Sequence, residues 1–297
     1  MWLSDILVAS FCFGAANYIR STKLLRNGTG NVLSPIQMIH VLIVVQAVLG
    51  ALCIKLFGFE RPPVKELCIL LGVGVTYVTY VLFVFYALRV SDLTVIGPLF
   101  PISFIPTLLI GWFWLGETLT LGDAVTCGFM IAATVAFAQG KRRAQRQVVV
   151  LMLFNALFFG LNACQIRWLK GCRFTTPEIF AWSRVMLVPV LVFLFPLFAW
   201  HVFLPVVRLP FKRKVLIGTS EFLNGFGILF MIQAFLCSRP TALVNTVVNC
   251  GVVLAFVVAG MIAARNIQWY RDEVMVNLGW KTIGVILMLS GLVMQLV

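Results

Sequence analysis

Ten long apolar runs, separated by short segments that carry most of the charge, constrain this chain more than any other feature of its sequence. Each run is close to the roughly 20 residues that an α-helix needs to cross the hydrocarbon core of a bilayer. Backbone polar groups in lipid must be satisfied within their own segment, so runs of this length predict helices. The runs cover residues 3–19, 35–57, 67–88, 93–115, 120–138, 148–164, 177–200, 215–236, 240–263 and 277–296. We therefore expect an all-α, multi-pass integral membrane protein with ten transmembrane helices.

The composition agrees with lipid as the main solvent. Hydrophobic residues make up 61% of the 297 and charged residues 11%, against roughly 45–50% and about 25% in soluble domains. The net charge of +13 comes from Lys and Arg grouped between the runs, as in Lys141-Arg142-Arg143. Such groups are typical of membrane loops that face anionic lipid. The expected partner of these charges is therefore the lipid bilayer and no nucleic acid.

Metal and enzyme sites are not indicated. The eight cysteines are scattered, and neither a CxxC pair nor Cys/His ligand spacing occurs, so we expect no metal site. The chain has two widely separated histidines and no aspartate well inside a run. A membrane-embedded enzyme usually needs paired acids or a histidine cluster, and the sequence therefore argues against an enzyme.

A weak internal repeat appears when the chain is shifted by 147 residues. Ile19-Arg20 then falls on Ile166-Arg167, and Ala87, Ser91 and Thr94 fall on Ala234, Ser238 and Thr241. These matches predict two five-helix repeats, residues 1–140 and 146–297. Because five is odd, successive repeats enter the membrane from opposite sides and are inverted. Inverted repeats are common in secondary transporters, whose substrate site lies between the halves.

One segment resembles a known family. Residues Ala87 to Ala138 resemble the last two helices of an EamA domain, of the drug/metabolite transporter superfamily. The likeness rests on the Ala-Leu before a Ser, three prolines of the fourth run and the Gly116-Glu117 hairpin. It implies a ten-helix carrier of a small organic metabolite, working by alternating access through a central cavity without a cofactor.

The second half departs from this pattern, because Ala263-Ala264-Arg265 stands where Gly-Glu would recur. This departure leaves open an alternative function, that of a membrane scaffold or assembly protein on a degenerate transporter fold. A homodimer is also left open.

Glu221 is the most informative candidate for substrate binding. A carboxylate inside an apolar run is costly and usually faces a cavity or a partner. It would bind a substrate amine or carry a proton; alternatively, the helix begins later and Glu221 lies near the headgroups. Asn224 shares its helical face, and Asn245 and Asn249 form a second amide pair, which would bind solute or bond helix to helix.

The remaining candidates each have a packing alternative. Tyr77 and Tyr80 would stack on a solute or pack. Arg184 would bind an anion, pair with Glu221 or extend to the interface. Amides inside the first and sixth runs are the other substrate-binding candidates: Asn17, Asn155 and Asn162.

Three prolines of the fourth run, Pro98, Pro101 and Pro106, predict a kink and a hinge. Orientation stays open. Lys and Arg are more numerous in the loops after odd-numbered runs, which places both termini outside the cytosol. The sequon Asn27-Gly28-Thr29 in the first such loop requires the opposite orientation.

Overall fold

The computed structural model describes residues 2–20, 33–91, 96–138, 146–194, 206–237, 239–251 and 278–294, and this part of the chain contains helices and no strand. Five helices are long and apolar enough to cross a membrane. They are α1 (Trp2–Ile19), α2 (Pro35–Phe57), α3 (Val64–Val90), α7 (Arg146–Lys170) and α11 (Phe211–Phe235). The all-α prediction is confirmed for the described residues.

Shorter elements complete the described fold. They are α6 (Leu121–Ala138), α8 (Thr176–Val185), α9 (Leu187–Leu194), a helix over residues 241–251, and α14 (Leu278–Val293). The predicted runs 3–19, 35–57 and 120–138 agree with α1, α2 and α6 to within one residue. The sequon at Asn27 and the basic group at 141–143 lie outside the described residues.

The proline-rich fourth run is not one continuous α-helix. It consists of a 3₁₀ segment η2 (Gly97–Ser103), a short α5 (Phe104–Ile110) and a π-helical turn η3 (Gly111–Leu115). Pro98 and Pro101 lie in η2 and Pro106 lies in α5, as the three prolines predicted. A proline ring lacks the N–H that an α-helix would use, so tighter 3₁₀ geometry replaces it here.

The predicted run 177–200 is also broken. Helix α8 ends at Val185, and α9 begins at Leu187 after a turn at Met186. Pro189 explains the break, because its ring would clash with the carbonyl of Val185 four residues earlier. The sequence contained this signal, and the single-helix expectation did not use it.

Local sequence fixes several helix ends. Ser34 caps α2 in a reciprocal capping box with Gln37, and Gly58 ends the same helix with a positive φ of 67°. Thr175 and Glu178 form the corresponding box at the start of α8. Each box satisfies two N–H groups that a helix start leaves without partners.

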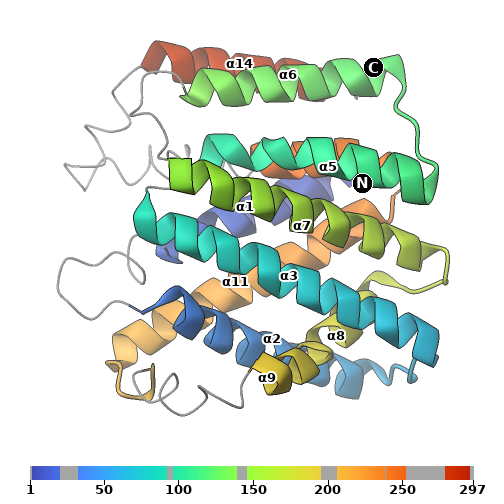
Figure 1. The fold of residues 1–297 in the computed structure, drawn as a ribbon, viewed down its shortest axis with the longest axis vertical. Helices are drawn as coiled ribbons and strands as arrows, with labels where there is room; N and C mark the ends of the chain where they lie inside the picture. Colours follow the sequence, from blue (N-terminus) through green and yellow to red (C-terminus); the bar gives the residue numbers. More distant parts are fainter. Residues whose placement is uncertain are drawn as a thin grey trace.

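The helices lie roughly along one direction in stacked rows (Figure 1), from α6 and α14 at one edge to α2, α8 and α9 at the other. Contacts between the first and second halves of the chain follow a regular scheme. Helix α1 packs on α11, α3 on α7, α2 on α8, and α6 on α14. The buried core therefore lies along the interface between the two halves, which is where a site shared by both would form.

Candidate functional site

Glu221 and Arg20 form a buried ion pair. Glu221 follows ten helical residues of α11 and has no exposed surface. Its Oε1 accepts hydrogen bonds from Nη2 of Arg20 at 2.7 Å and from Nε at 3.1 Å. Arg20 comes directly after α1, is 2% exposed and also donates from Nη1 to Asn17 Oδ1 at 3.3 Å. The carboxylate thus has the charged partner that a buried charge needs.

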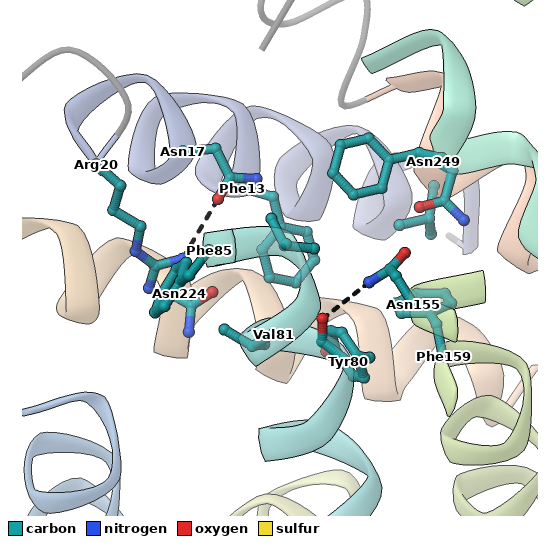
Figure 2. Close-up of a pocket in the computed structure, with 13 residues that line it drawn as sticks. Phe13, Asn17, Arg20, Tyr80, Val81, Phe85, Asn155, Phe159, Asn224 and Asn249 are labelled. Atoms are coloured by element: carbon teal, nitrogen blue, oxygen red, sulfur yellow. Dashed lines mark hydrogen bonds between the residues drawn. The ribbon is translucent and has the colours of Figure 1, made fainter. Parts of the chain in front are cut away.

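Arg20 of this pair lines a cavity between the two halves of the chain (Figure 2). About 50 Å³ of it is open to water-sized molecules. Aromatic rings and valine side chains form most of the wall, and four amides interrupt them. The lining residues are Phe13, Asn17, Arg20, Tyr80, Val81, Val84, Phe85, Phe100, Asn155, Phe159, Asn224, Val248 and Asn249. We call this space the central cavity.

Asn224 and Tyr77 connect the cavity wall to a second arginine. Asn224 Nδ2 donates to the Tyr77 hydroxyl at 2.6 Å. On the ring of Tyr77, the Arg184 guanidinium carbon lies 4.0 Å from the centroid. Tyr77 also meets Tyr80 edge to face, with ring centroids 5.4 Å apart. Arg184 therefore lies behind the cavity wall and does not form the ion pair with Glu221 that was one of its predicted roles.

Asn245 and Asn249 bond the 241–251 helix to the proline-rich segment. Asn245 Nδ2 donates to the Ser103 carbonyl at 3.1 Å and to Thr107 Oγ1 at 2.5 Å. Asn249 Nδ2 donates to Ser103 Oγ at 2.8 Å and to Asn245 Oδ1 at 2.6 Å. Helix-to-helix bonding was one of the two readings of these amides, and Asn249 also lines the central cavity.

Two side-chain amides of α7 donate hydrogen bonds to α3. Asn155 Nδ2 donates to the carbonyl of Tyr80 at 3.0 Å, which Figure 2 shows at the cavity. Asn162 Nδ2 donates to the Val73 carbonyl at 2.8 Å and to Thr76 Oγ1 at 2.9 Å, and Asn162 does not line the central cavity. Of the two, only Asn155 is placed where it would meet a solute.

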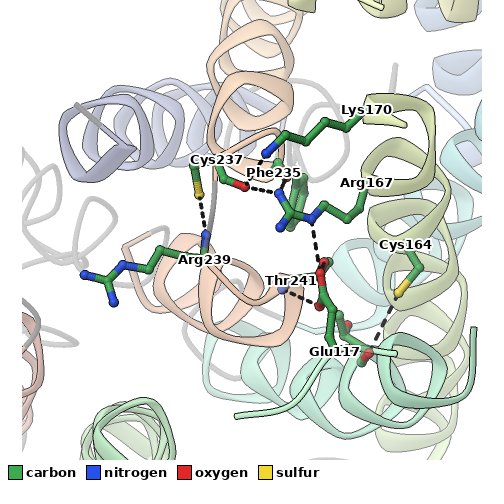
Figure 3. Close-up of polar contacts among 9 residues, drawn as sticks. Glu117, Cys164, Arg167, Lys170, Phe235, Cys237, Arg239 and Thr241 are labelled. Atoms are coloured by element: carbon green, nitrogen blue, oxygen red, sulfur yellow. Dashed lines mark hydrogen bonds and ion pairs between the residues drawn. The ribbon is translucent and has the colours of Figure 1, made fainter. Parts of the chain in front are cut away.

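A second polar cluster joins the halves away from the cavity (Figure 3). Glu117 Oε1 accepts from Arg167 Nε at 3.1 Å and from Thr241 Oγ1 at 2.8 Å. Its Oε2 accepts from the Thr241 N–H at 2.7 Å, at the first residue of the 241–251 helix. Carboxylates are favourable at helix starts. Arg167 also donates to the carbonyls of Phe235 and Cys237. We call Glu117, Arg167 and Thr241 the Glu117 bridge.

Sequence reasoning missed both ion pairs. It marked Glu117 only as part of a hairpin motif, and it matched Arg20 with Arg167 only as equivalent positions. That match was the available signal, since each of these arginines ends the first helix of its half and each forms an ion pair with a carboxylate.

The family comparison supplies the identification. The model that matches residues 2–138 is that of the EamA-like transporter family. Residues 2–138 belong to the EamA-like transporter family. The resemblance seen in Ala87–Ala138 is thereby confirmed, and the family consists of membrane transporters. With its apolar helices, the chain is an integral, multi-pass membrane protein, as its apolar runs predicted.

Solved structures extend the fold to the whole chain. One crystal structure of a protein matches with a TM-score of 0.64 and 16% sequence identity, covering 98% of this chain and 96% of that chain. At this identity the likeness establishes the fold alone. Among curated proteins, none matches the chain.

Proposed function

We propose that the protein is a secondary transporter that moves a small organic metabolite by alternating access through the central cavity. The main support for this proposal is the central cavity, because both halves of the chain contribute polar side chains to its wall. Asn17 and Arg20 come from the first half, and Asn155, Asn224 and Asn249 come from the second. A site shared by two halves changes its exposure when the halves rock against each other.

The helix contacts support two inverted five-helix repeats, residues 1–140 and 146–297. Helix α1, the first of its half, packs on α11, which corresponds to the third apolar run of the other half. Reciprocally, α3 packs on α7. The second helices, α2 and α8, and the last, α6 and α14, pack on each other. A two-fold relation between repeats gives this reciprocal scheme, whereas unrelated halves would have no reason to produce it.

The cavity dimensions agree with an occluded state in such a cycle. Drug-sized ligands occupy pockets of roughly 300–1,000 Å³, and the central cavity holds about 50 Å³. A metabolite therefore requires the halves to separate. Pro98, Pro101 and Pro106 lie where the chain leaves α-helical geometry, and we assign them the hinge. The Glu117 bridge joins the halves and must open when its side of the protein opens.

A membrane scaffold on a degenerate transporter fold is the second candidate. It is favoured by Ala264, which stands where the repeat would place the counterpart of Glu117. A buried ion pair and four amides around an aromatic cavity speak for transport, because polar groups inside a membrane are costly to keep without a use.

Thermal unfolding of the purified protein in detergent tests the proposal. The panel contains amino acids, nucleotides, nucleotide sugars, sugar phosphates and cationic metabolites. A ligand of the folded state raises the melting temperature by mass action, and a stabilising solute is then tested for uptake into proteoliposomes. Uptake should fall in Asn17→Ala and Asn224→Ala but not in the exposed control Arg89→Met. If no solute stabilises the protein or enters the vesicles, the scaffold function replaces the transporter.

A further inference from the structure

Arg184 is a buried cation that takes part in neither of the ion pairs described above. It is the second-last residue of α8 and is 1% exposed. Its Nε and Nη1 are buried and make no hydrogen bond within the described part of the chain. Two aromatic rings face the guanidinium, with Tyr77 at 4.0 Å and Phe180 at 5.9 Å from the guanidinium carbon to the ring centroids, and Tyr77 is also a hydrogen-bond partner of Arg184. Arg184 thus has packing partners and lacks a countercharge.

A guanidinium cannot relieve this situation by losing its proton, because it stays charged in proteins. Glu221 is the nearest candidate for a countercharge, and it is bound to Arg20. The three buried charges, Arg20, Glu221 and Arg184, therefore leave a net charge of +1 beside the cavity. Buried charges without partners are strongly unfavourable, so this excess predicts a negatively charged ligand.

Arg184 is one side chain away from the cavity. Its guanidinium stacks on Tyr77, whose hydroxyl accepts from Asn224 at 2.6 Å. Asn224 and Tyr80 line the cavity, and Tyr80 meets the edge of Tyr77. Tyr77 and Asn224 thus connect the guanidinium to the wall of the central cavity.

The helix that carries Arg184 is interrupted directly after it. Helix α8 ends one residue later, and Pro189 prevents its continuation into α9. Arg184 therefore lies at the end of a short helix, directly before a break in helical geometry.

We propose that Arg184 is a ligand of the transport site and that the transported solute carries a carboxylate or phosphate, which neutralises the excess positive charge. This inference rests on the proposed transport function and names its substrate class. In the occupied state the oxyanion accepts charge-assisted hydrogen bonds from the unpaired Nε and Nη1 groups of the guanidinium.

The test compares charged solutes with neutral analogues in thermal unfolding of the full-length protein. The pairs are acetate and acetamide, benzoate and benzamide, glutamate and glutamine, and glucose 6-phosphate and glucose. NaCl keeps the ionic strength equal within each pair. We expect at least one anion to raise the melting temperature by about 2 °C or more while its neutral analogue does not. The carboxylate and phosphate arms distinguish the two oxyanions.

Arg184→Met supplies the second readout, with Arg20→Met as the matched control. Removing an uncompensated charge should leave the melting temperature of the solute-free protein unchanged or higher, and the response to the anion should disappear. Arg20→Met instead removes a paired charge and should lower the melting temperature. A fall in Arg184→Met as large as in Arg20→Met, or failure of that variant to fold, would show a structural arginine and overturn the proposal.

The remaining outcomes are also decisive. If neutral and charged members of a pair stabilise equally, or Arg184→Met keeps the response to the anion, the transporter proposal stands and the anion assignment is wrong. If no anion stabilises the wild-type protein while a solute without negative charge does, the substrate class is likewise wrong. If no solute of either panel binds or is transported, both proposals fail together.

Discussion

Replacing Glu221 with glutamine leaves the Arg20 guanidinium buried without a countercharge. The side chains of the pair are 3% and 0% exposed, and Glu221 Oε1 accepts two hydrogen bonds from Arg20. Removing one partner of a buried pair costs about 3–5 kcal/mol. At about 2–4 °C per kcal/mol, the melting temperature should fall by roughly 6–20 °C. Arg20→Met should cost less, because the carboxyl group left behind can take up a proton whereas a guanidinium cannot release one.

The double variant Arg20→Met with Glu221→Leu separates the pair from its parts. Replacing both charges by apolar groups of similar size is often neutral or stabilising, so the double variant should melt above either single variant. The assay is thermal unfolding in one detergent, with the exposed Arg89→Met as a control that should change stability by less than about 0.5 kcal/mol. If the double variant loses as much as the two single variants added together, the residues are not coupled and the assignment of a buried ion pair is refuted.

Two further predictions concern the interface between the halves. Glu117→Gln removes the charge that holds Arg167 and weakens the cap on the 241–251 helix; because the pair is 16% and 17% exposed, we expect a loss of only about 1 kcal/mol. Maleimide should then label Cys237 faster than in the exposed control Glu60→Gln, and equal rates would contradict the role of the bridge. Gly160→Ala would place a Cβ 2.9 Å from the backbone nitrogen of Thr107 and should cost about 1–3 kcal/mol, whereas Gly128→Ala meets nothing within 4 Å and should be neutral or stabilising by up to about 1 kcal/mol. Equal melting temperatures for the two alanine variants would show that α7 does not pack on α5 this tightly.

The apolar runs predicted most of the described helices, because lipid permits so few backbone solutions. Where prediction failed, a proline was decisive. Pro189 divides the expected run 177–200 into two helices, whereas the break at the three prolines of the fourth run was predicted and only its 3₁₀ geometry was not. Both effects are local, and a more careful reading of Pro189 would have found the first.

The site was only partly accessible from the sequence. Glu221 was identified because a carboxylate is expensive in an apolar run, and its burial agrees with that argument. Arg20 was passed over because an arginine at the end of a run is usually a flanking residue. Which carboxylate binds which arginine depends on how α1 meets α11, and no local pattern encodes that contact. The hydrogen bond between Tyr77 and Asn224 is tertiary in the same sense.

If the protein transports as proposed, the Glu117 bridge affects which conformation the empty protein prefers. On the proposed 147-residue repeat, the position equivalent to Glu117 is Ala264, which has no carboxylate to offer. The two entrances, derived from one ancestral hairpin, would then be held closed by interactions of unequal free energy. Each 1.4 kcal/mol of that inequality changes the ratio of the two resting conformations tenfold. The buried Arg20–Glu221 pair also joins the halves, where α1 ends, so the entrance that the empty protein keeps shut would be the one whose ion pair contributes more.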